Sequence, residues 1–447
     1  MGIRKLARDT ALLTVSSLLM RCIGLVYQVW LAGRIGAAGV GLWQLVMSVS
    51  GFAATLAISG IRFTTTRLVS EELGLGREGG AGRAMRRCLA YAAAFGTAAC
   101  ALLFTGAEPI GFLWVGDART VRALHITALS LPMISLSSVL NGYFIASGRA
   151  WRSAAVQTAE QVLGVGCVMA LLSRADGADL ERCCCAIALG CLLADAASLA
   201  LITALYATDR RGRRRSGAPA GLTGRMLRIA LPLALSAYAR AGLTTLQQLL
   251  VPRKLRSAGL SAERALAGYG TVTGMVMPVV FFPSCLLSAA AELAVPELTA
   301  HQVRGDRARL TRTAELLLRA SLAFALAVAA FLFFTADALG FLIYKSREVG
   351  PYIRLLSLLV PVMYMDIVTD GCLKGLGQML WSMGFNIAEA VVGVALVLTV
   401  LPRWALNGWL AVLFFCEIFN FALSYGRLKQ VLDFRLLPIR RKKGSDR

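Results

Sequence analysis

Charged and metal-binding residues are scarce in this 447-residue sequence. Only 16% of the residues are charged and 57% are hydrophobic, whereas soluble globular domains have about 25% charged residues. A soluble chain of this length would need polar surface for two or three domains, and too little polar material is available. The two histidines and the eleven cysteines show no paired CxxC spacing, which argues against a zinc site or a disulfide framework. Because there is also no Walker A motif, direct ATP hydrolysis is not supported, and the sequence predicts neither an enzyme nor a bound cofactor.

Long apolar stretches are abundant instead, and the mean hydropathy is +0.66. A helix needs about 20 mostly apolar residues to cross about 30 Å of hydrocarbon, because each residue rises about 1.5 Å. We therefore expect about twelve transmembrane helices, and no soluble domain between them. The stretches lie near residues 10–32, 41–61, 84–105, 121–146, 154–173, 183–207, 226–250, 267–291, 313–335, 352–373, 381–401 and 404–425.

The net charge of +22 could indicate a nucleic-acid-binding protein, but the distribution of the charge does not favour one. Lysine and arginine gather at the two termini, in the loop around residues 77–87, in the run 210–215 and in the loop 304–312. This is the positive-inside pattern of membrane proteins. It predicts a multi-pass protein of the cytoplasmic membrane with both termini in the cytoplasm, in contact with membrane lipids and not with nucleic acid.

The sequence also contains an internal repeat with an offset of 229 residues. Over about 33 residues without a gap, proline, glycine, serine and glutamate recur at matching places. Hydrophobicity alone would not align these residue types. The matched pairs are Pro132 with Pro361, Gly142 with Gly371, Gly148 with Gly377, Ser153 with Ser382, Glu160 with Glu389 and Gly164 with Gly393.

The repeat predicts an all-α polytopic membrane protein made of two six-helix halves. Six is an even number of passes, so both halves enter from the same side and are oriented in parallel, as in alternating-access transporters. We expect an N-terminal lobe at 1–207, a basic cytoplasmic linker at 208–224, a C-terminal lobe at 225–426 and a basic cytoplasmic tail at 427–447. A channel stays open as an alternative, although no filter-like segment is present.

Three arginines are candidates for binding an anionic substrate. Arg21 and Arg240 lie near the middle of the first and seventh apolar stretches, and Arg62 lies at the cytoplasmic end of the second. A charged group inside a membrane is costly and therefore needs a reason. A guanidinium group suits phosphate well. The alternative is that these side chains bond to backbone carbonyls, reach the interface or, for Arg62, anchor the helix there.

The tenth apolar stretch contains the candidates for cation coupling. Asp366, Asp370 and Lys374 are spaced by four residues, which places them on about one face of a helix. The two carboxylates are candidate sites for Na⁺ or a proton. The alternative is an Asp370–Lys374 ion pair beside one hydrogen-bonded aspartate.

The repeated pair Glu160 and Glu389 is a candidate for a structural hydrogen-bonding role. Both halves retain this glutamate at the same position of the repeat. A charge kept in both halves is more typical of a shared structural need than of coupling in one half.

The first 75 residues contain five runs with a familiar pattern, namely Arg21–Gln28, Ala32–Gly39, Gly41–Gln44, Ile58–Ile61 and Arg67–Leu73. These runs resemble the multidrug/oligosaccharidyl-lipid/polysaccharide flippase superfamily, and the chain is most similar to its stage V sporulation protein B-like branch. That branch is related to lipid II flippases of peptidoglycan synthesis and to polysaccharide exporters. The resemblance extends over the whole chain in length, number of spans and repeat.

This resemblance implies a MATE-like fold with a V-shaped central cavity between the two lobes. It also implies a monomeric transporter that flips a lipid-linked sugar pyrophosphate, in cell-wall or spore synthesis. Arg21 matches the first-span arginine of the lipid II flippases. Their second arginine, about two turns later, is replaced here by the Tyr27-Gln28 stretch, so lipid II itself is not indicated.

Two other functions remain open at this point. One is a Na⁺- or proton-coupled multidrug exporter that relies on Asp366 and Asp370. Drug-exporting members of the family typically have an acidic residue in the first span, and this first span has none. The other is a membrane scaffold without transport activity, which would not explain intramembrane charges.

Overall fold

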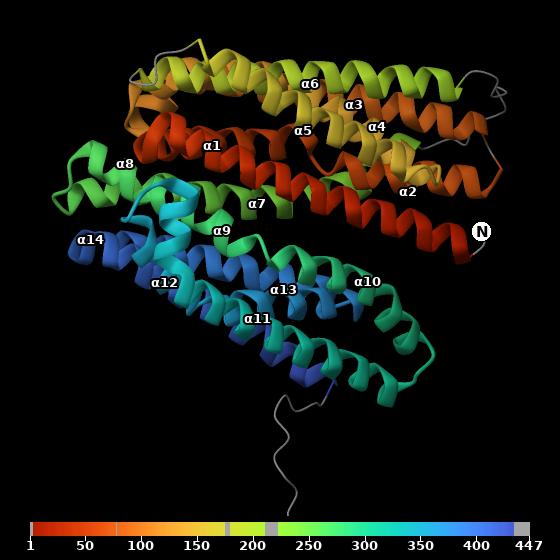
Figure 1. Ribbon diagram of the computed structural model, residues 1–447. Coiled ribbons are helices and arrows are strands. Elements are labelled where there is room, and N and C mark those ends of the chain that lie inside the picture. Colours follow the sequence, from red (N-terminus) through yellow and green to blue (C-terminus); the bar gives the residue numbers. More distant parts are fainter. Residues whose placement is uncertain (1–2, 77, 175–178, 211–221, 433–447) are drawn as a thin grey trace, which may run out of the picture. The chain divides into compact units, whose positions relative to one another are not determined.

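The computed structural model describes residues 3–76, 78–174, 179–210 and 222–432, and every regular element in these ranges is helical (Figure 1). Helices suit a chain without access to water, because each backbone N–H and C=O is bonded within its own segment. The helices are α1 (Ile3–Ile58), α2 (Ile61–Gly74), α3 (Glu78–Pro109), α4 (Val121–Ala146), α5 (Ala150–Leu172), α6 (Leu180–Arg210), α7 (Leu222–Ser257), α8 (Ala262–Gly270), α9 (Met277–Phe281), α10 (Ser284–Val303), α11 (Arg307–Tyr344), α12 (Val349–Ser357), α13 (Val360–Gly375) and α14 (Met379–Leu432).

Eight of the described helices are long and apolar enough to cross a membrane, and two bent helix pairs bring the number to ten. Two of the eight are too long for one crossing. Helix α1 has 56 residues and α14 has 54, which correspond to about 80 Å each against about 30 Å of hydrocarbon. Each contains one residue with non-helical backbone angles, Gly36 in α1 and Ala405 in α14. If each of these helices crosses twice, the predicted twelve passes result, and the protein is an all-α polytopic membrane protein.

The chain forms two compact units. The first contains Met1–Pro278 and Val394–Trp409, and the second contains Val279–Gly393 and Leu410–Arg447. Helix α7 therefore packs within the first unit. The division into two lobes joined by a linker at 208–224 is inferred from the sequence repeat, and it remains a prediction. Residues 211–221 of that linker lie outside the described residues.

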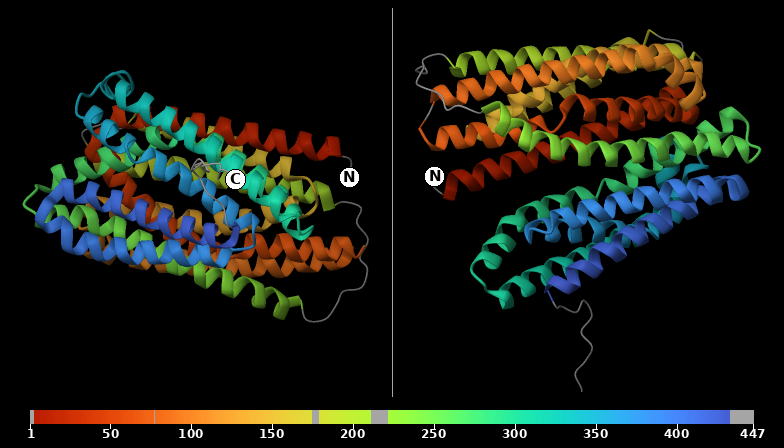
Figure 2. Two further views of the ribbon diagram at one scale, coloured as in Figure 1. Left: turned by 90° about the horizontal axis from the view of Figure 1, so that it is seen from below. Right: turned by 180° about the vertical axis from the view of Figure 1, so that it is seen from behind.

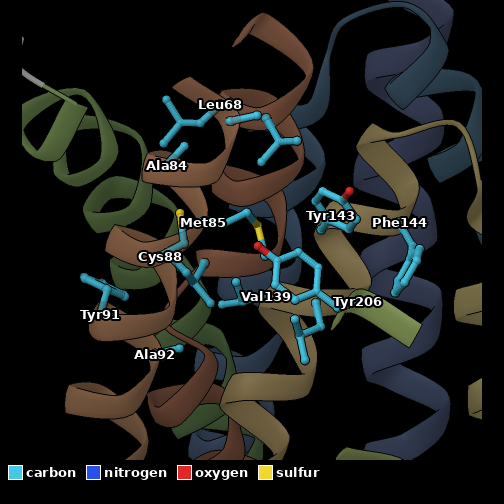
Figure 3. Close-up of a cluster of buried hydrophobic side chains, with 14 of the residues drawn as sticks. Leu68, Ala84, Met85, Cys88, Tyr91, Ala92, Val139, Tyr143, Phe144 and Tyr206 are labelled. Carbon is cyan, nitrogen blue, oxygen red and sulfur yellow. The ribbon is translucent and has the colours of Figure 1, made fainter. Parts of the chain in front are cut away.

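In the first unit, α3 packs against α4, α4 against α6, and α5 against α6; Figure 2 shows these helices from two further directions. A tightly packed cluster of buried side chains lies where α2, α3, α4 and α6 meet. Figure 3 shows Met85 and Cys88 of α3 close to Val139 of α4 and Tyr206 of α6. Lipid tails are as apolar as these side chains, so close packing and hydrogen bonds, more than the hydrophobic effect, hold such helices together.

Helix α7 is attached to α1 and α2 along most of its length. Its carbonyl at Ala230 approaches Gly60 so closely that a Cβ at residue 60 would lie 2.9 Å from that oxygen. Small residues permit such close backbone contacts between membrane helices. Polar bonds support the contact at three levels, namely Arg225–Glu72 (2.9 Å), Tyr238 Oη–Ser59 Oγ (2.6 Å) and Thr245 Oγ1–Ser48 O (3.1 Å).

In the second unit, α13 packs against α10 and α11, and α11 packs against α12. The buried Tyr364 of α13 donates a hydrogen bond from its hydroxyl to the carbonyl of Val280 (2.7 Å). Helices α12 and α13 meet at an angle of 54°, and Pro361 stands in the first turn of α13. Its repeat partner Pro132 lies inside the continuous helix α4. The same position of the repeat is therefore at a helix start in the second unit and within a helix in the first.

The repeat recurs in the local geometry of α4 and α13. Two residues after each helix ends stands a glycine with positive φ, 68° at Gly148 and 70° at Gly377. At both ends three backbone hydrogen bonds follow the same pattern, including Arg149 N to Phe144 O and Gln378 N to Leu373 O. Only glycine adopts this left-handed conformation without strain. The glycine that recurs at the 229-residue offset therefore belongs to a helix-ending motif that both units share.

Candidate functional site: a polar cavity and a buried aspartate

A cavity of about 540 Å³ lies inside the first unit, lined by α1, α2, α4, α5 and α6. Its walls follow helical spacing, so one face of each helix points into it. Polar side chains contribute much of the lining, which is unusual for the interior of a membrane protein and marks a functional site. They include Arg62, Ser137, Ser138, Asn141, Gln157, Glu160, Gln161 and Asp195.

Arg62 stands at one end of this cavity. It is exposed, and among the described residues it has no carboxylate within ion-pair distance. Its backbone carbonyl lies against Gly142 of α4, where an added Cβ would be 2.7 Å away. Nearby, Ser153 donates to Asn141 Oδ1 (2.5 Å) and accepts from Gln157 Nε2 (3.3 Å). This end of the cavity is rich in hydrogen-bonding groups and positively charged.

The carboxylates lie further along the cavity. Glu160 accepts a hydrogen bond from Ser198 Oγ (2.5 Å), and Asp195 interacts with the hydroxyl of Ser130. Ser130 and Gly142 are twelve residues apart on α4, so the Arg62 end and the Asp195 end are separated by about 18 Å along that helix. An anionic group can therefore bind at the Arg62 end without meeting Asp195.

The other two predicted arginines do not line this cavity. Arg21 and Arg240 are both exposed and form no ion pair with another described residue. Arg21 is adjacent to Met20, which does line the cavity and whose carbonyl accepts a hydrogen bond from Gln161 Nε2 (2.8 Å). Their predicted role in binding substrate remains a prediction.

The predicted coupling residues lie in the second unit and divide into two groups. Asp370 forms an ion pair with Lys374 (2.6 Å) and accepts a hydrogen bond from Ser382. Asp366 instead accepts one from Asn420 Nδ2 of α14 (3.1 Å). Two buried oxygen atoms, Asp366 Oδ1 and Asn420 Oδ1, have no hydrogen-bond partner among the described residues. Such buried atoms are costly when nothing bonds to them.

Sequence reasoning did not identify Asn420, Gln157 or Gln161. A usable signal was present for the two glutamines, because they lie with Glu160 on consecutive turns of one face of α5. No local pattern identifies Asn420, since its partner Asp366 is 54 residues away.

The family model described as "Polysaccharide biosynthesis protein" matches residues 6–302. The chain belongs to this family. A second family model, MatE, matches residues 256–399, and together they confirm the membrane-transporter superfamily that the first 75 residues resemble. The protein is accordingly a multi-pass membrane transporter of that superfamily.

Two curated relatives come from Bacillus subtilis (strain 168). Stage V sporulation protein B is 21% identical over 406 residues, which cover 90% of this chain and 78% of that protein. Sporulation protein YkvU is 18% identical over 400 residues, which cover 88% of this chain and 87% of that protein. The chain therefore matches these family members over nearly all of its length.

Solved structures show the same fold. The lipid II flippase MurJ in an inward closed conformation has a TM-score of 0.72 at 12% identity and covers 94% of this chain and 87% of its own. An inward-facing multidrug resistance MATE family transporter has a TM-score of 0.68 at 17% identity. The match covers 92% of this chain and 95% of that transporter. At these identities the likeness concerns the fold and not the substrate.

Proposed function

We propose that the chain is a flippase that carries a lipid-linked, pyrophosphate-bearing sugar precursor across the cytoplasmic membrane. The observation that supports this most is Arg62, a guanidinium at the polar end of the membrane cavity that has no carboxylate partner in the described part of the chain. A planar guanidinium binds phosphate oxygens through two parallel hydrogen bonds. Asn141 and Gln157, which line the same cavity, supply groups that match sugar hydroxyls.

The family and its relatives support the sugar-linked substrate class. The matching family is one of polysaccharide biosynthesis, and both curated relatives are sporulation proteins. We propose that this chain acts in wall or spore-envelope synthesis, with its basic loops and both termini in the cytoplasm, as the positive-inside pattern predicts. Arg21 and Arg240 would assist Arg62 in holding the anionic head group.

The experiment compares Arg62→Ala with Arg67→Ala in proteoliposomes. Arg67 lies on the same helix but is paired with Glu71 (3.0 Å) and does not line the cavity. Transfer of a fluorescent polyprenyl-pyrophosphate sugar should fall at least tenfold in Arg62→Ala, since charge-assisted bonds to a buried anion contribute about 1.5–3 kcal/mol each. Arg67→Ala should stay within twofold of the wild type. Equal transfer rates in both variants would refute the proposed role of Arg62.

A second function is favoured by the orphaned oxygens in the second unit. We propose that Asp366 and Asn420 bind the coupling ion, Na⁺ or a proton, whether the exported molecule is a lipid-linked sugar or a drug. Carboxylate and amide oxygens are suitable ligands for a hard cation. Asp370 is a weaker candidate, because its carboxylate already forms an ion pair with Lys374 and accepts a hydrogen bond from Ser382.

A further inference from the structure

A second cavity, of about 790 Å³, lies in the second unit, far along the chain from the polar cavity of the first. It is formed by the turn between α10 and α11, the first two turns of α11 and the last residues of α14. Figure 1 shows the α10–α11 turn and the end of α14 within this unit. The lining residues are His301, Gln302, Gly305, Arg307, Ala308, Leu310, Thr311, Arg312, Glu315, Leu376, Val431 and Leu432.

The charge of this cavity favours an anion. Arg307 and Arg312 both line it and have no carboxylate within ion-pair distance among the described residues. Its one lining carboxylate, Glu315, is paired with Arg319 (3.4 Å), which does not line the cavity. The cavity also opens at the first turn of α11. There the Asp306 side chain caps the helix by accepting a hydrogen bond from Arg309 N (3.1 Å), so the two arginines and not the helix terminus supply the positive charge.

The walls of the cavity are apolar beneath this charged rim. Leu310, Leu376 and Leu432 are buried and form its inner lining. Two polar groups already have partners, because Thr311 Oγ1 donates to Leu432 O (3.2 Å) and Gln302 Nε2 donates to Leu376 O (3.3 Å). A cationic rim above apolar walls matches a molecule that joins a phosphate to a hydrocarbon chain.

We propose that this cavity binds the phosphate of an anionic phospholipid head group, and that Arg307 and Arg312 hold it. Residues 304–312, which form the α10–α11 turn and the start of α11, belong to the basic side of the sequence, which the positive-inside pattern assigns to the cytoplasm. The cytoplasmic leaflet is the one that carries anionic lipid. This site is separate from the transport cavity, so binding at it can be measured without any transport assay.

The test titrates the purified full-length chain with phosphatidylglycerol and counts bound lipids by native mass spectrometry, with phosphatidylcholine as the zwitterionic control. Arg307→Gln with Arg312→Gln should weaken phosphatidylglycerol binding about thirtyfold, since each basic residue near the membrane contributes about 1 kcal/mol and about 1.4 kcal/mol corresponds to tenfold. The matched control is Arg304→Gln with Arg309→Gln. It removes the same formal charge from the same stretch of chain, but neither residue lines the cavity, and Arg309 is already paired with Asp306 (3.2 Å). This control should change binding less than threefold.

A further variant separates a specific cavity from diffuse surface charge. Ala308→Trp keeps every charge but fills the cavity, because Ala308 is one of its lining residues, and it should also weaken binding about tenfold. Equal losses in the two double variants, or unchanged binding in Ala308→Trp, would overturn the proposal. Inorganic phosphate is then added at about 10 mM, a concentration suited to a weak anion site. If it displaces the bound lipid, the cavity is a phosphate site whose ligand is free phosphate and not the lipid. Failure of phosphate to displace the lipid identifies the lipid as the ligand.

Discussion

Asp366 and Asp370 are spaced by one helical turn, yet their surroundings differ. The spacing correctly places both on helix α13, and the ion pair of Asp370 with Lys374 is the alternative that the sequence left open. Asp366 reaches Asn420 on another helix, and its Oδ1 has no hydrogen-bond partner among the residues that the structure describes. The sequence identified the carboxylates, but it could not tell them apart because the partners that distinguish them are distant in the chain.

We expect Asp366→Asn to remove the dependence of transport on the coupling ion. An amide at this position retains the size of the side chain but does not provide the charge that holds a cation or releases a proton. Transport would be measured in proteoliposomes with and without an inward Na⁺ gradient, and separately with a pH gradient. Stimulation by either gradient should disappear in this variant.

Asp370→Asn is the matched control for that experiment. It removes one partner of a half-exposed ion pair, which costs at most about 1 kcal/mol of stability, and it should keep the gradient dependence. If Asp370→Asn abolishes the dependence while Asp366→Asn preserves it, the coupling assignment is wrong and the ion pair itself is the coupling element.

The 229-residue offset also relates the polar residues of the two units. Ser137 and Cys191, which line the first cavity, correspond by this offset to Asp366 and Asn420. Likewise Asn141 bonds to Ser153 where Asp370 bonds to Ser382. The repeat therefore preserves the positions of the polar contacts but changes which of them carry charge. Arg62 corresponds to Ala291, so the cationic end of the cavity belongs to the first unit.

At the scale of the helix, glycines set how closely α1 and α8 approach. A Cβ on Gly41 would lie 2.2 Å from the carbonyl oxygen of Leu266, and one on Gly270 would lie 2.1 Å from that of Ala37. These are backbone atoms and cannot move aside easily. The sequence showed a glycine-rich segment at 33–41, but hydropathy does not reveal which glycine meets another helix.

We expect Gly41→Ala to destabilise the protein by about 2–3 kcal/mol, because the methyl group forces α1 and α8 apart. The loss would be measured as a lower thermal midpoint of the purified protein in detergent. Gly51→Ala is the control, since it lies on the same helix with nothing within 4 Å of its Cβ, and alanine there should be neutral or slightly stabilising. Equal destabilisation in both variants would mean that helix propensity, and not the contact with α8, determines the effect.

The connection between α3 and α4 depends on one carboxylate outside the membrane-spanning segments. Asp117 accepts hydrogen bonds from the backbone N–H of Arg119 (3.1 Å) and from its side chain (2.6 Å). Burial alone would raise the pKa of the Asp117 carboxyl, but the bonds and charge of Arg119, with a further contribution from Arg256, hold this pKa below its usual range. Arg256 also donates to the carbonyl of Gly116 (2.9 Å), which ties this connection to α7.

A lowered pKa in the folded state means that Asp117 contributes stability above its unfolded pKa of about 3.9 and loses it as the pH falls through the lower folded value. We therefore expect the wild type to lose stability below about pH 4 through this group. Asp117→Asn should be about 1 kcal/mol less stable at pH 7, with a smaller further loss in acid. Thermal midpoints at pH 7 and pH 3.5 measure both effects. If the midpoints of the wild type and of Asp117→Asn fall by the same amount between these two pH values, Asp117 does not have this role.

At the scale of the whole molecule, hydropathy correctly predicted a polytopic all-α membrane protein, and the described residues show eight to ten membrane-length spans. It could not predict that the pass from α8 to α10 is broken, with a 58° bend and the π-helix Thr271–Val276 before it. It also did not predict that α7 and α8 pack within the first unit. Hydropathy is a local property, whereas these features depend on contacts such as Gly41 with Leu266 between residues far apart in the chain.

The passes around the second cavity make a prediction about topology that can be tested in intact cells. One pass separates Ser257 from Arg304, and one pass, α11, separates Arg304 from Glu348. Ser257 and Glu348 should therefore lie outside the cytoplasm, and Arg304 inside it. In a background that lacks the native cysteines, Ser257→Cys and Glu348→Cys should react with a membrane-impermeant maleimide, while Arg304→Cys should react only after permeabilisation. Labelling of Arg304→Cys alone would reverse the orientation, and it would place the proposed lipid site in the leaflet with little anionic lipid.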